Sequence, residues 1–184
     1  MSLYATPIPD AAEIRANQTF EALMWALSRP GTIQTLTEPG HSSIADALVD
    51  RECRVHTDDP TLARQMQAAG AVLSEPELAD HAFLSLATDA GLAAFARLPA
   101  GSALYPDEGA TVVAEARFGQ GQGQRLRLTG PGIETAVEIA VDGLAPGFWA
   151  ARAARCRYPE GIDLFLTCGT AVIGLPRSTR IEVL

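Results

Sequence analysis

The fold class is indicated by the stretch AFLSLATDAGLAAFARL, residues 82–98. Its first part, AFLSLAT (82–88), is a continuous apolar run, which is typical of a buried strand. The part that follows, DAGLAAFARL (89–98), is predicted to be a helix with Asp89 as its N-terminal cap. A strand followed directly by a helix is the building unit of α/β layer folds.

The same alternation of helix and strand extends towards the N-terminus. Apolar residues lie near helical spacing within residues 11–28, namely Ile14, Phe20, Leu23, Met24 and Leu27. The sequence Arg29-Pro30-Gly31 is expected to end this helix, and TIQTL (32–36) is expected to form a short strand.

Two further helices flank the strand that is predicted at ECRVHT (52–57). SSIADALVD (42–50) is predicted to be a helix capped by Ser42 or Ser43. DDPTLARQMQAAG (58–70) is predicted to be a helix with Asp59 as N-cap, Pro60 in its first position and Gly70 beyond its end.

The second half of the sequence is richer in strands. Strands are predicted within ATVVAEARF (110–118), QRLRLTG (124–130), IETAVEIAVDGL (133–144), GIDLFLTCG (161–169), AVIGLP (171–176) and TRIEVL (179–184). PGFWAARAARCRYP (146–159) is predicted to be a helix with Trp149 and Ala153 on its buried side. We therefore expect residues 1–184 to form a single α/β domain around a mixed sheet with helices on both faces.

The composition indicates that the chain buries surface in addition to its own hydrophobic core. Hydrophobic residues make up 47% and charged residues 20% of the chain, below the usual quarter for charged residues. An oligomer would bury such surface, and exposed apolar patches for partners are the alternative; we favour a homodimer. The sequence has no apolar run of membrane-spanning length and no leader-like N-terminus, so we expect a cytoplasmic protein without membrane contact.

The charges indicate which ligand classes the chain could serve. The net charge is −8, and residues 1–92 hold 13 acids and 5 arginines while residues 93–184 hold 9 of each. This balance speaks against nonspecific nucleic-acid binding, while a local arginine site for a phosphorylated small molecule stays open. All 14 basic residues are arginine, which excludes a Schiff-base lysine, a P-loop lysine and a lysine general base.

Several motifs that resemble catalytic sites have simpler structural interpretations. GQGQGQ (119–124) and TGPGI (129–133) lead into strands rather than helices, so they predict a hairpin loop and a turn instead of phosphate loops. His41, His56 and His81 have no metal-ligand spacing, so no metal site is expected. Cys168 precedes a Gly-Thr turn into another strand, without a helix to activate it, and is predicted to be a buried structural cysteine. No catalytic residue is predicted.

If the chain has a ligand site, its arginines should build it, because guanidinium groups form paired hydrogen bonds with phosphate and phosphonate oxygens. Arg177 is the first candidate, since it follows a strand and lies beside the hydroxyls of Ser178 and Thr179. Arg127 and Arg29 are the next candidates. The loop at 105–111 adds Asp107 and Glu108, for which turn formation is the alternative role. For the arginines the alternatives are structural ion pairs and subunit contacts.

Several segments together resemble one family. They are FEALMWALSRPGT (20–32), the loop at 105–111, LRLTGPGI (126–133), PEGIDLFLTC (159–168) and PRST (176–179). In this order they closely resemble the PhnH family of phosphonate metabolism proteins, the H subunits of the bacterial carbon–phosphorus lyase core complex. The resemblance runs from about residue 8 to the end.

The resemblance implies a fold similar to that of pyridoxal-phosphate-dependent transferases, without the cofactor. It also implies assembly with subunits G, I and J of the complex. That complex transfers a phosphonate onto the ribose of ATP with loss of adenine, as an alpha-D-ribose 1-methylphosphonate 5-triphosphate synthase, and no activity is expected from this subunit alone. The alternative is a free-standing α/β enzyme or binding protein for a phosphorylated small molecule.

Overall fold

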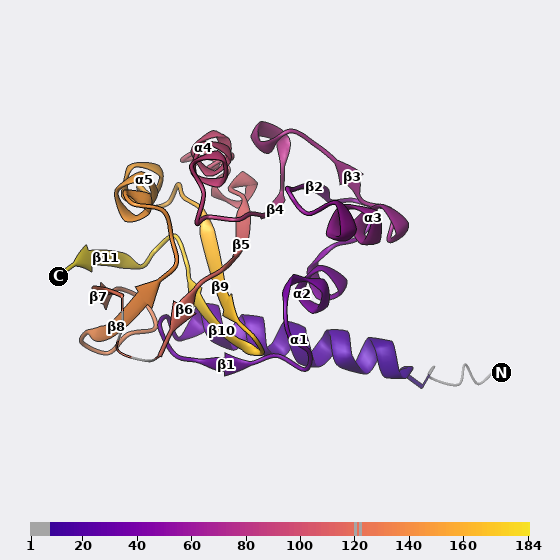
Figure 1. The fold of residues 1–184 in the computed structure, drawn as a ribbon, viewed down its shortest axis with the longest axis horizontal. Coiled ribbons are helices and arrows are strands. Elements are labelled where there is room, and N and C mark those ends of the chain that lie inside the picture. The colour runs from indigo at the N-terminus through magenta and orange to yellow at the C-terminus, as the bar shows by residue number, and fades with distance from the viewer. Residues whose placement is uncertain (1–7, 120, 122) are drawn as a thin grey trace.

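The structure, a computed structural model, describes residues 8–119, 121 and 123–184, and its centre is a seven-stranded mixed sheet (Figure 1). The strand order is β1-β10-β9-β5-β4-β2-β3. Strands β9, β5, β4, β2 and β3 are parallel, and β10 and β1 are antiparallel to their neighbours. Their bounds are β1 Gln34–Thr35, β2 Arg54–Thr57, β3 Val72–Leu73, β4 His81–Phe83, β5 Thr111–Glu115, β9 Asp163–Cys168 and β10 Ala171–Leu175.

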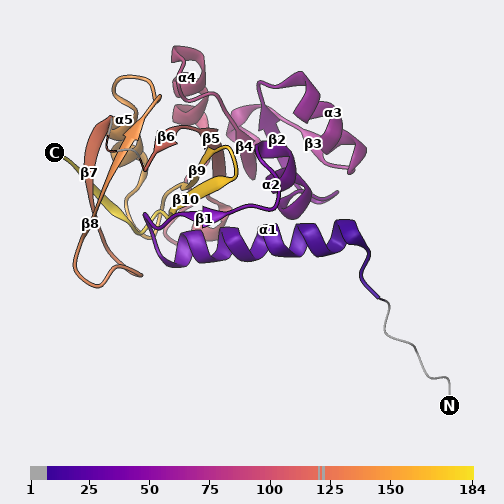
Figure 2. The same ribbon diagram turned by 60° about the horizontal axis from the view of Figure 1, so that its bottom comes forward.

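Both faces of this sheet are covered, as the alternation of strand and helix predicts. Side chains on one face of the sheet, such as Phe83, Val113 and Phe165, pack under α1 (Ala11–Ser28), α2 (His41–Leu48) and α3 (Pro60–Ala68). Side chains on the opposite face, such as Val112 and Leu164, pack towards α4 (Asp89–Arg97) and α5 (Phe148–Arg155). Figure 2 shows α1 lying along one side of the sheet and α4 on the other. The prediction of an α/β fold with a mixed sheet and helices on both faces is confirmed.

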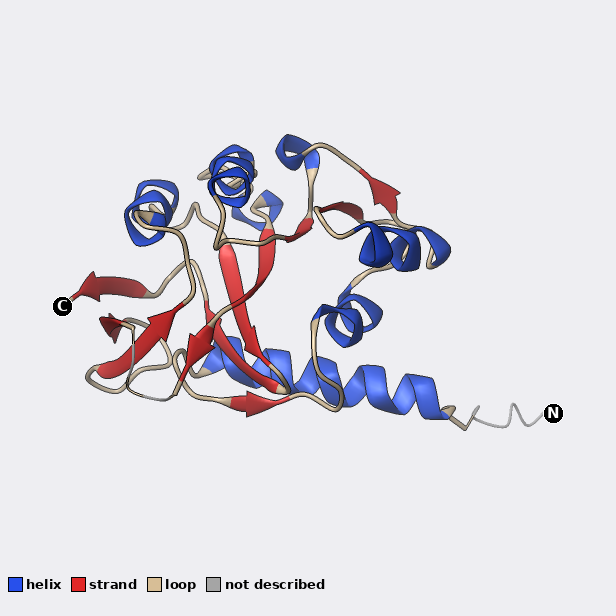
Figure 3. Cartoon of the chain, viewed as in Figure 1, coloured by secondary structure: helices blue, strands red, loops and turns tan. Residues whose placement is uncertain are grey.

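A second, antiparallel sheet shares the face of α4 and α5 (Figure 3). Its order is β11-β7-β8-β6, and its strands are β6 (Arg117–Phe118), β7 (Gln124–Thr129), β8 (Val137–Asp142) and β11 (Arg180–Val183). The sequence predicts these strands but not their separation from the main sheet. β6 and β7 both pair with β8 and not with each other, so the hairpin expected at GQGQGQ is wrong. Gln120 and Gln122 of that motif lie outside the described residues.

The buried face of α1 differs from the prediction. Leu23 is buried together with Thr19 and Ala26, whereas Ile14, Phe20 and Met24 are about half exposed. The reason is a close approach to β10: a Cβ atom at Gly174 would lie 2.6 Å from the carbonyl carbon of Ala26. A helix that lies this close to a strand makes the contact with small side chains, so its bulky residues point outward.

The strand expected at 82–88 ends at Phe83. Residues beyond it turn away from the sheet, and Leu84 and Leu86 are buried in the core under α4. The N-cap of α4 is Thr88 and not Asp89, because the Thr88 hydroxyl accepts a hydrogen bond from the Gly91 amide at 3.0 Å. Asp89 instead lies in the first turn, where a carboxylate favours the helix dipole.

The predicted cap of α2 is also wrong, whereas that of α3 is confirmed. α2 has Gly40 as its N-cap, and Ser42 and Ser43 lie inside the helix. Asp59 caps α3 by accepting hydrogen bonds from the amides of the two residues after Pro60, at 2.7 and 3.3 Å.

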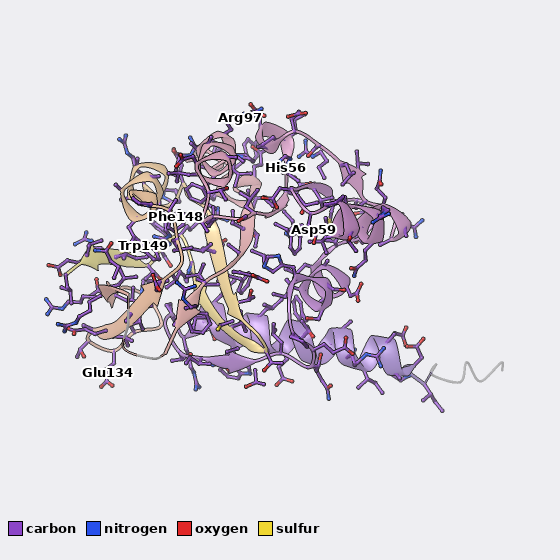
Figure 4. All side chains as sticks on the ribbon, in the orientation of Figure 1. His56, Asp59, Arg97, Glu134, Phe148 and Trp149 are labelled. Carbon is purple, nitrogen blue, oxygen red and sulfur yellow. The ribbon has the colours of Figure 1, made fainter. Side chains whose placement is uncertain are left out.

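Helix α5 confirms the prediction for Trp149 but not for Ala153, which is exposed. Phe148, Trp149 and Arg152 are the buried residues of α5. Phe148 contacts Phe95 and Trp149 edge-on, with ring centroids 5.1 and 5.0 Å apart, and Figure 4 labels Phe148 and Trp149 at this position. Among the described residues, no helix is both long and apolar enough to cross a lipid bilayer.

Candidate functional site

A cavity lies at the carboxyl ends of the parallel strands, where open α/β sheets bind their ligands. We call it the edge cavity, and its volume is about 490 Å³. Four strand ends contribute to it: Asp58 follows β2, Ser85 follows β4, Glu115 ends β5 and Cys168 ends β9. The remaining polar residues of its lining are His41, Asp59, Arg117 and Thr167.

His41 reaches the edge cavity because the start of α2 is tied to the turn between β9 and β10. The Gly40 amide donates a hydrogen bond to the carbonyl of Gly169, at 3.3 Å. Gly40 has a φ of +86°, which glycine adopts without strain. The His41 ring also lies 5.9 Å from the ring of Phe83, the last residue of β4. The imidazole therefore has a fixed position against the end of the sheet.

Burial lowers the pKa of His41, although Glu115, Asp58 and Asp59 act in the opposite direction. The imidazole is therefore neutral at pH 7. Its Nε2 atom is buried and has no hydrogen-bond partner among the described residues. A neutral imidazole with one free nitrogen can accept or donate a proton or bind a ligand.

Two carboxylates of the edge cavity already accept hydrogen bonds from backbone amides of the protein. Asp59 caps α3, and Asp58 accepts a hydrogen bond from the Ser85 amide at 3.1 Å. Arg117 pairs with Asp142 at 2.5 Å and holds the pKa of that carboxyl below its usual range. Since the arginine has its own counter-ion, the cavity is acidic on balance. Carboxylates accept hydrogen bonds from hydroxyl and amino groups, which fits a polyhydroxylated or amino-bearing ligand.

Cys168 is exposed, so the prediction of a buried cysteine is wrong. The predicted tight turn is confirmed, since β9 and β10 pair up to Cys168 and Ala171. Cys168 has the same parity as the buried Leu164 and Leu166, but it lies at the strand end and lines the edge cavity. A residue's parity predicts its face of the sheet, and its distance from the strand end decides whether anything covers it.

Most of the edge cavity was missed from the sequence. From the sequence, His41 is considered only for a metal site and Asp59 only as a helix cap. Position gives a partial signal, because Asp58 directly follows the strand predicted at 52–57 and Cys168 lies near the end of the strand predicted at 161–169. Glu115 lies inside the strand predicted at 110–118, so its place at a strand end had no such signal. In the part of the chain that the structure describes, no three His, Cys, Asp or Glu side chains are placed to hold a metal ion.

The predicted ligand residues Arg177, Ser178 and Thr179 lie together at the other end of β9, in a second pocket of about 360 Å³. We call it the arginine pocket; α5 and the connection from β10 to β11 enclose it. Its remaining charged side chains are Arg152, Arg157 and Arg180.

Arg177 itself is engaged within the protein. It pairs with Asp163, the first residue of β9, with 2.7 Å between Nη2 and Oδ2. Its guanidinium also donates to the carbonyls of Pro106 and Gly109. Arg177 therefore holds the loop that carries Asp107 and Glu108, whose own side chains are exposed.

The other two candidate arginines lie elsewhere. Arg127 is on the exposed face of β7 and pairs with Glu138 at 3.1 Å and with Glu182 at 3.5 Å. Arg29 stacks on Trp25, with its guanidinium carbon 4.5 Å from the ring centroid. The structure thus brings three of the seven predicted ligand residues into one pocket.

Comparisons with known proteins point to one family. A family model described as bacterial phosphonate metabolism protein (PhnH) matches residues 10–182. A putative C-P lyase subunit protein HtxG of Stutzerimonas stutzeri is 35% identical over 180 residues, which cover 92% of this chain and 87% of that protein. The alpha-D-ribose 1-methylphosphonate 5-triphosphate synthase subunit PhnH of Rhizobium meliloti (strain 1021) is 32% identical over 197 residues, covering 97% and 94%.

Proposed function

Because the chain belongs to the PhnH family of bacterial phosphonate metabolism proteins, we propose that it is a subunit of a carbon–phosphorus lyase core complex. In that complex it would support the transfer of a phosphonate onto the ribose of ATP, with loss of adenine. The observation that carries this proposal is the family match to residues 10–182, which extends from the start of α1 into β11. The partners would be subunits G, I and J.

We propose that the edge cavity is the part of the chain that faces the reacting molecules. Its three carboxylates could accept hydrogen bonds from ribose hydroxyls or from an amino group, and the neutral His41 could bind either a donor or an acceptor. The cavity opens at the edge of the sheet, where a partner subunit could complete its walls. Without such a partner it is a binding surface and not a closed active site.

The test is adenine release from ATP and methylphosphonate, with the chain alone and with subunits G, I and J. We expect release only when all four are present, and loss of release when this chain is omitted. Release that continues without the chain would overturn the subunit role, and release by the chain alone would overturn its dependence on partners.

The edge cavity has its own test in the assembled complex. His41→Gln and Glu115→Gln should each lower adenine release about tenfold or more, the scale of a lost charged or acid–base contact. Glu134→Gln is the matched control, because Glu134 is exposed between β7 and β8 (Figure 4). Unchanged rates in assembled His41 and Glu115 variants would show that this cavity does not contact the reactants.

A homodimer is the second part of the proposal, and the outward face of α1 is its proposed surface. Ile14, Phe20, Met24 and Trp25 are 41–52% exposed along this helix, and we call them the α1 stripe. Four large apolar side chains exposed on one helix, even with the exposed Asn17 and Glu21 between them, favour a protein contact. A second copy is the occupant we propose, because a two-fold contact would cover both stripes at once and fits the low charge content of 20%.

Light scattering should give twice the monomer mass of 19.4 kDa for the purified chain. Phe20→Asp should give a monomer, because it would bury a charge at the centre of the contact. Leu104→Asp is the control, since Leu104 is 76% exposed and lies in the loop between α4 and β5. A monomeric parent, or a Phe20 variant that stays dimeric, would contradict the proposal.

We also propose that the fold of the chain is similar to that of pyridoxal-phosphate-dependent transferases, without the cofactor. A mixed sheet between two layers of helices supports it. An internal aldimine needs a lysine amine, and the sequence contains none. Incubation with pyridoxal phosphate and borohydride should therefore leave no reduced adduct on a side chain.

A further inference from the structure

The arginine pocket concentrates positive charge in a chain whose net charge is −8. Four arginines line it: Arg152 of α5, Arg157 before β9, Arg177 before β11, and Arg180, the first residue of β11. Among the described residues, Arg177 alone of these four has a carboxylate within ion-pair distance, that of Asp163. Most exposed arginines elsewhere, such as Arg54 and Arg97, are paired with acids. The pocket therefore carries a surplus of cations that the fold itself does not neutralise.

Arg152 is the cation at the floor of the pocket, and it is only 3% exposed. Its Nη2 donates to the carbonyls of Leu175 and Pro176 at 3.1 and 2.9 Å, and its Nη1 donates to the carbonyl of Thr179 at 3.3 Å. Its Nε is buried without a hydrogen-bond partner. Burial lowers the pKa of Arg152, but an arginine still keeps its proton in a protein. A buried cation held only by carbonyl groups lacks the counter-ion that would offset its desolvation.

Thr179 adds a second unsatisfied group at the same place. It is 3% exposed, lines the pocket, and its Oγ1 has no hydrogen-bond partner among the residues described. Buried hydroxyls are almost always hydrogen-bonded in native proteins. The adjacent Ser178 also lines the pocket and brings a further hydroxyl donor. Hydroxyl donors beside unpaired guanidinium groups are the groups that bind phosphate oxygens.

We propose that the arginine pocket binds a phosphate or phosphonate dianion. Arg157 and Arg180, which are exposed at the pocket, would supply the paired hydrogen bonds to the oxygens. Arg152 would supply fixed positive charge beneath the anion, and Ser178 and Thr179 would supply hydroxyl donors. A volume of about 360 Å³ admits a small anion or one phosphorylated group.

This site is separate from the edge cavity. The arginine pocket adjoins the beginning of β9 at Asp163, through Arg177, and the edge cavity contains the last residue of the same strand, Cys168. The pocket would bind a dianion in the isolated chain, whether or not the chain acts in a larger complex. A failure of the phosphate test therefore leaves the proposed function standing, and the reverse also holds.

The experiment is a calorimetric titration of the purified full chain with inorganic phosphate and, separately, with methylphosphonate. We expect saturable binding of one dianion per chain, weakened by added salt because the contact is electrostatic. Arg157→Gln combined with Arg180→Gln should weaken this binding at least tenfold. Both side chains are exposed, so this variant should keep its fold. Arg51→Gln with Arg64→Gln is the control, because it removes the same charge from exposed arginines outside the pocket and should change binding less than twofold.

Absence of saturable binding to the parent chain would overturn the proposal, as would equal binding by the two double variants. An acidic decapeptide is a third titrant, since a cationic surface could instead dock an acidic segment of another protein. Tight binding of that peptide with no binding of phosphate would reject the small-anion site in favour of a protein contact.

Discussion

At the scale of single residues, Arg177 shows how far a side chain's role depends on distant partners. The sequence predicts it as a ligand residue from the neighbouring hydroxyls of Ser178 and Thr179. In the structure its guanidinium contacts Asp163, Pro106 and Gly109, which are 14, 71 and 68 positions away in the chain. The neighbours could be read from the sequence, and the distant partners could not. Its role in ligand binding stays a prediction.

Arg177→Ala should lower the free energy of unfolding by about 2–4 kcal/mol, because it leaves the mostly buried carboxylate of Asp163 unpaired. Urea denaturation measures the loss. Asp163→Asn in the same background should add much less than it does alone, since the two residues act as a pair. Arg97→Ala is the control: its pair with Glu77 is half exposed, so the cost should stay below about 1 kcal/mol. Equal losses for both arginines would contradict the structural role of Arg177.

Cys168 should be the most reactive thiol of the chain. It is exposed, whereas Cys53 and Cys156 are half-buried, and burial raises the pKa of Cys53. A higher pKa leaves less of the reactive thiolate at neutral pH. Iodoacetamide labelling followed by mass spectrometry should modify Cys168 first at pH 7.5. Labelling of Cys53 or Cys156 at the same rate would show that the β9–β10 turn is covered.

At the scale of elements, the sequence predicts which helices and strands exist better than it predicts where they end and how the strands pair. Helix α3 is correct at both ends because Asp59, Pro60 and Gly70 mark it locally. The end of β4 and the cap of α4 were misplaced because the apolar residues after Phe83 enter a core on leaving the sheet. The second sheet was missed because β7 pairs with β11, some fifty positions later, and no local signal reports such a pairing.

Gly174 tests the contact between α1 and β10. A Cβ at this position would lie 2.6 Å from the backbone of Ala26, and neither backbone can move without shifting a whole element. Gly174→Ala should therefore cost about 1–3 kcal/mol, the range for overpacked cores, in urea denaturation. Thr35→Ala on neighbouring β1 is the control, because Thr35 is exposed. A neutral Gly174→Ala would mean that α1 does not rest directly on the strand.

At the scale of the whole molecule, the alternation of strands and helices along the sequence predicts the α/β fold class better than it predicts where the sites lie. The parallel order β9-β5-β4-β2-β3 makes one edge of the sheet collect the strand ends that line the edge cavity. That order is set by pairings between distant segments, so the cavity could not be located from the sequence alone. The expectation of a single domain over residues 1–184 stays a prediction.

The stability of the fold should depend on pH through two half-buried histidines. Burial lowers the pKa of His41 and of His81 below the ordinary value, so both are neutral in the folded chain. The unfolded chain binds more protons below about pH 6.5, and protonation then favours unfolding. The free energy of unfolding should be constant from pH 8 to 7 and should fall from pH 6.5 to 5. His41→Gln should reduce this slope, and a slope of zero in the parent would contradict the lowered pKa of both histidines.

The uneven placement of charge along the chain becomes an electric dipole in space. The 13 acids and 5 arginines of residues 1–92 lie mainly on or beside α1, α2, α3 and the β2–β3 edge. Figure 1 shows α2, α3, β3 and the start of α1 towards one end of the long axis. α5 and β11, whose residues line the arginine pocket, lie towards the other end together with the evenly charged second sheet. Such a molecule is turned by the field of an approaching charged surface before contact, and a positive partner meets the α3 end first. Its encounters in solution are therefore oriented, and this orientation fades as the ionic strength rises.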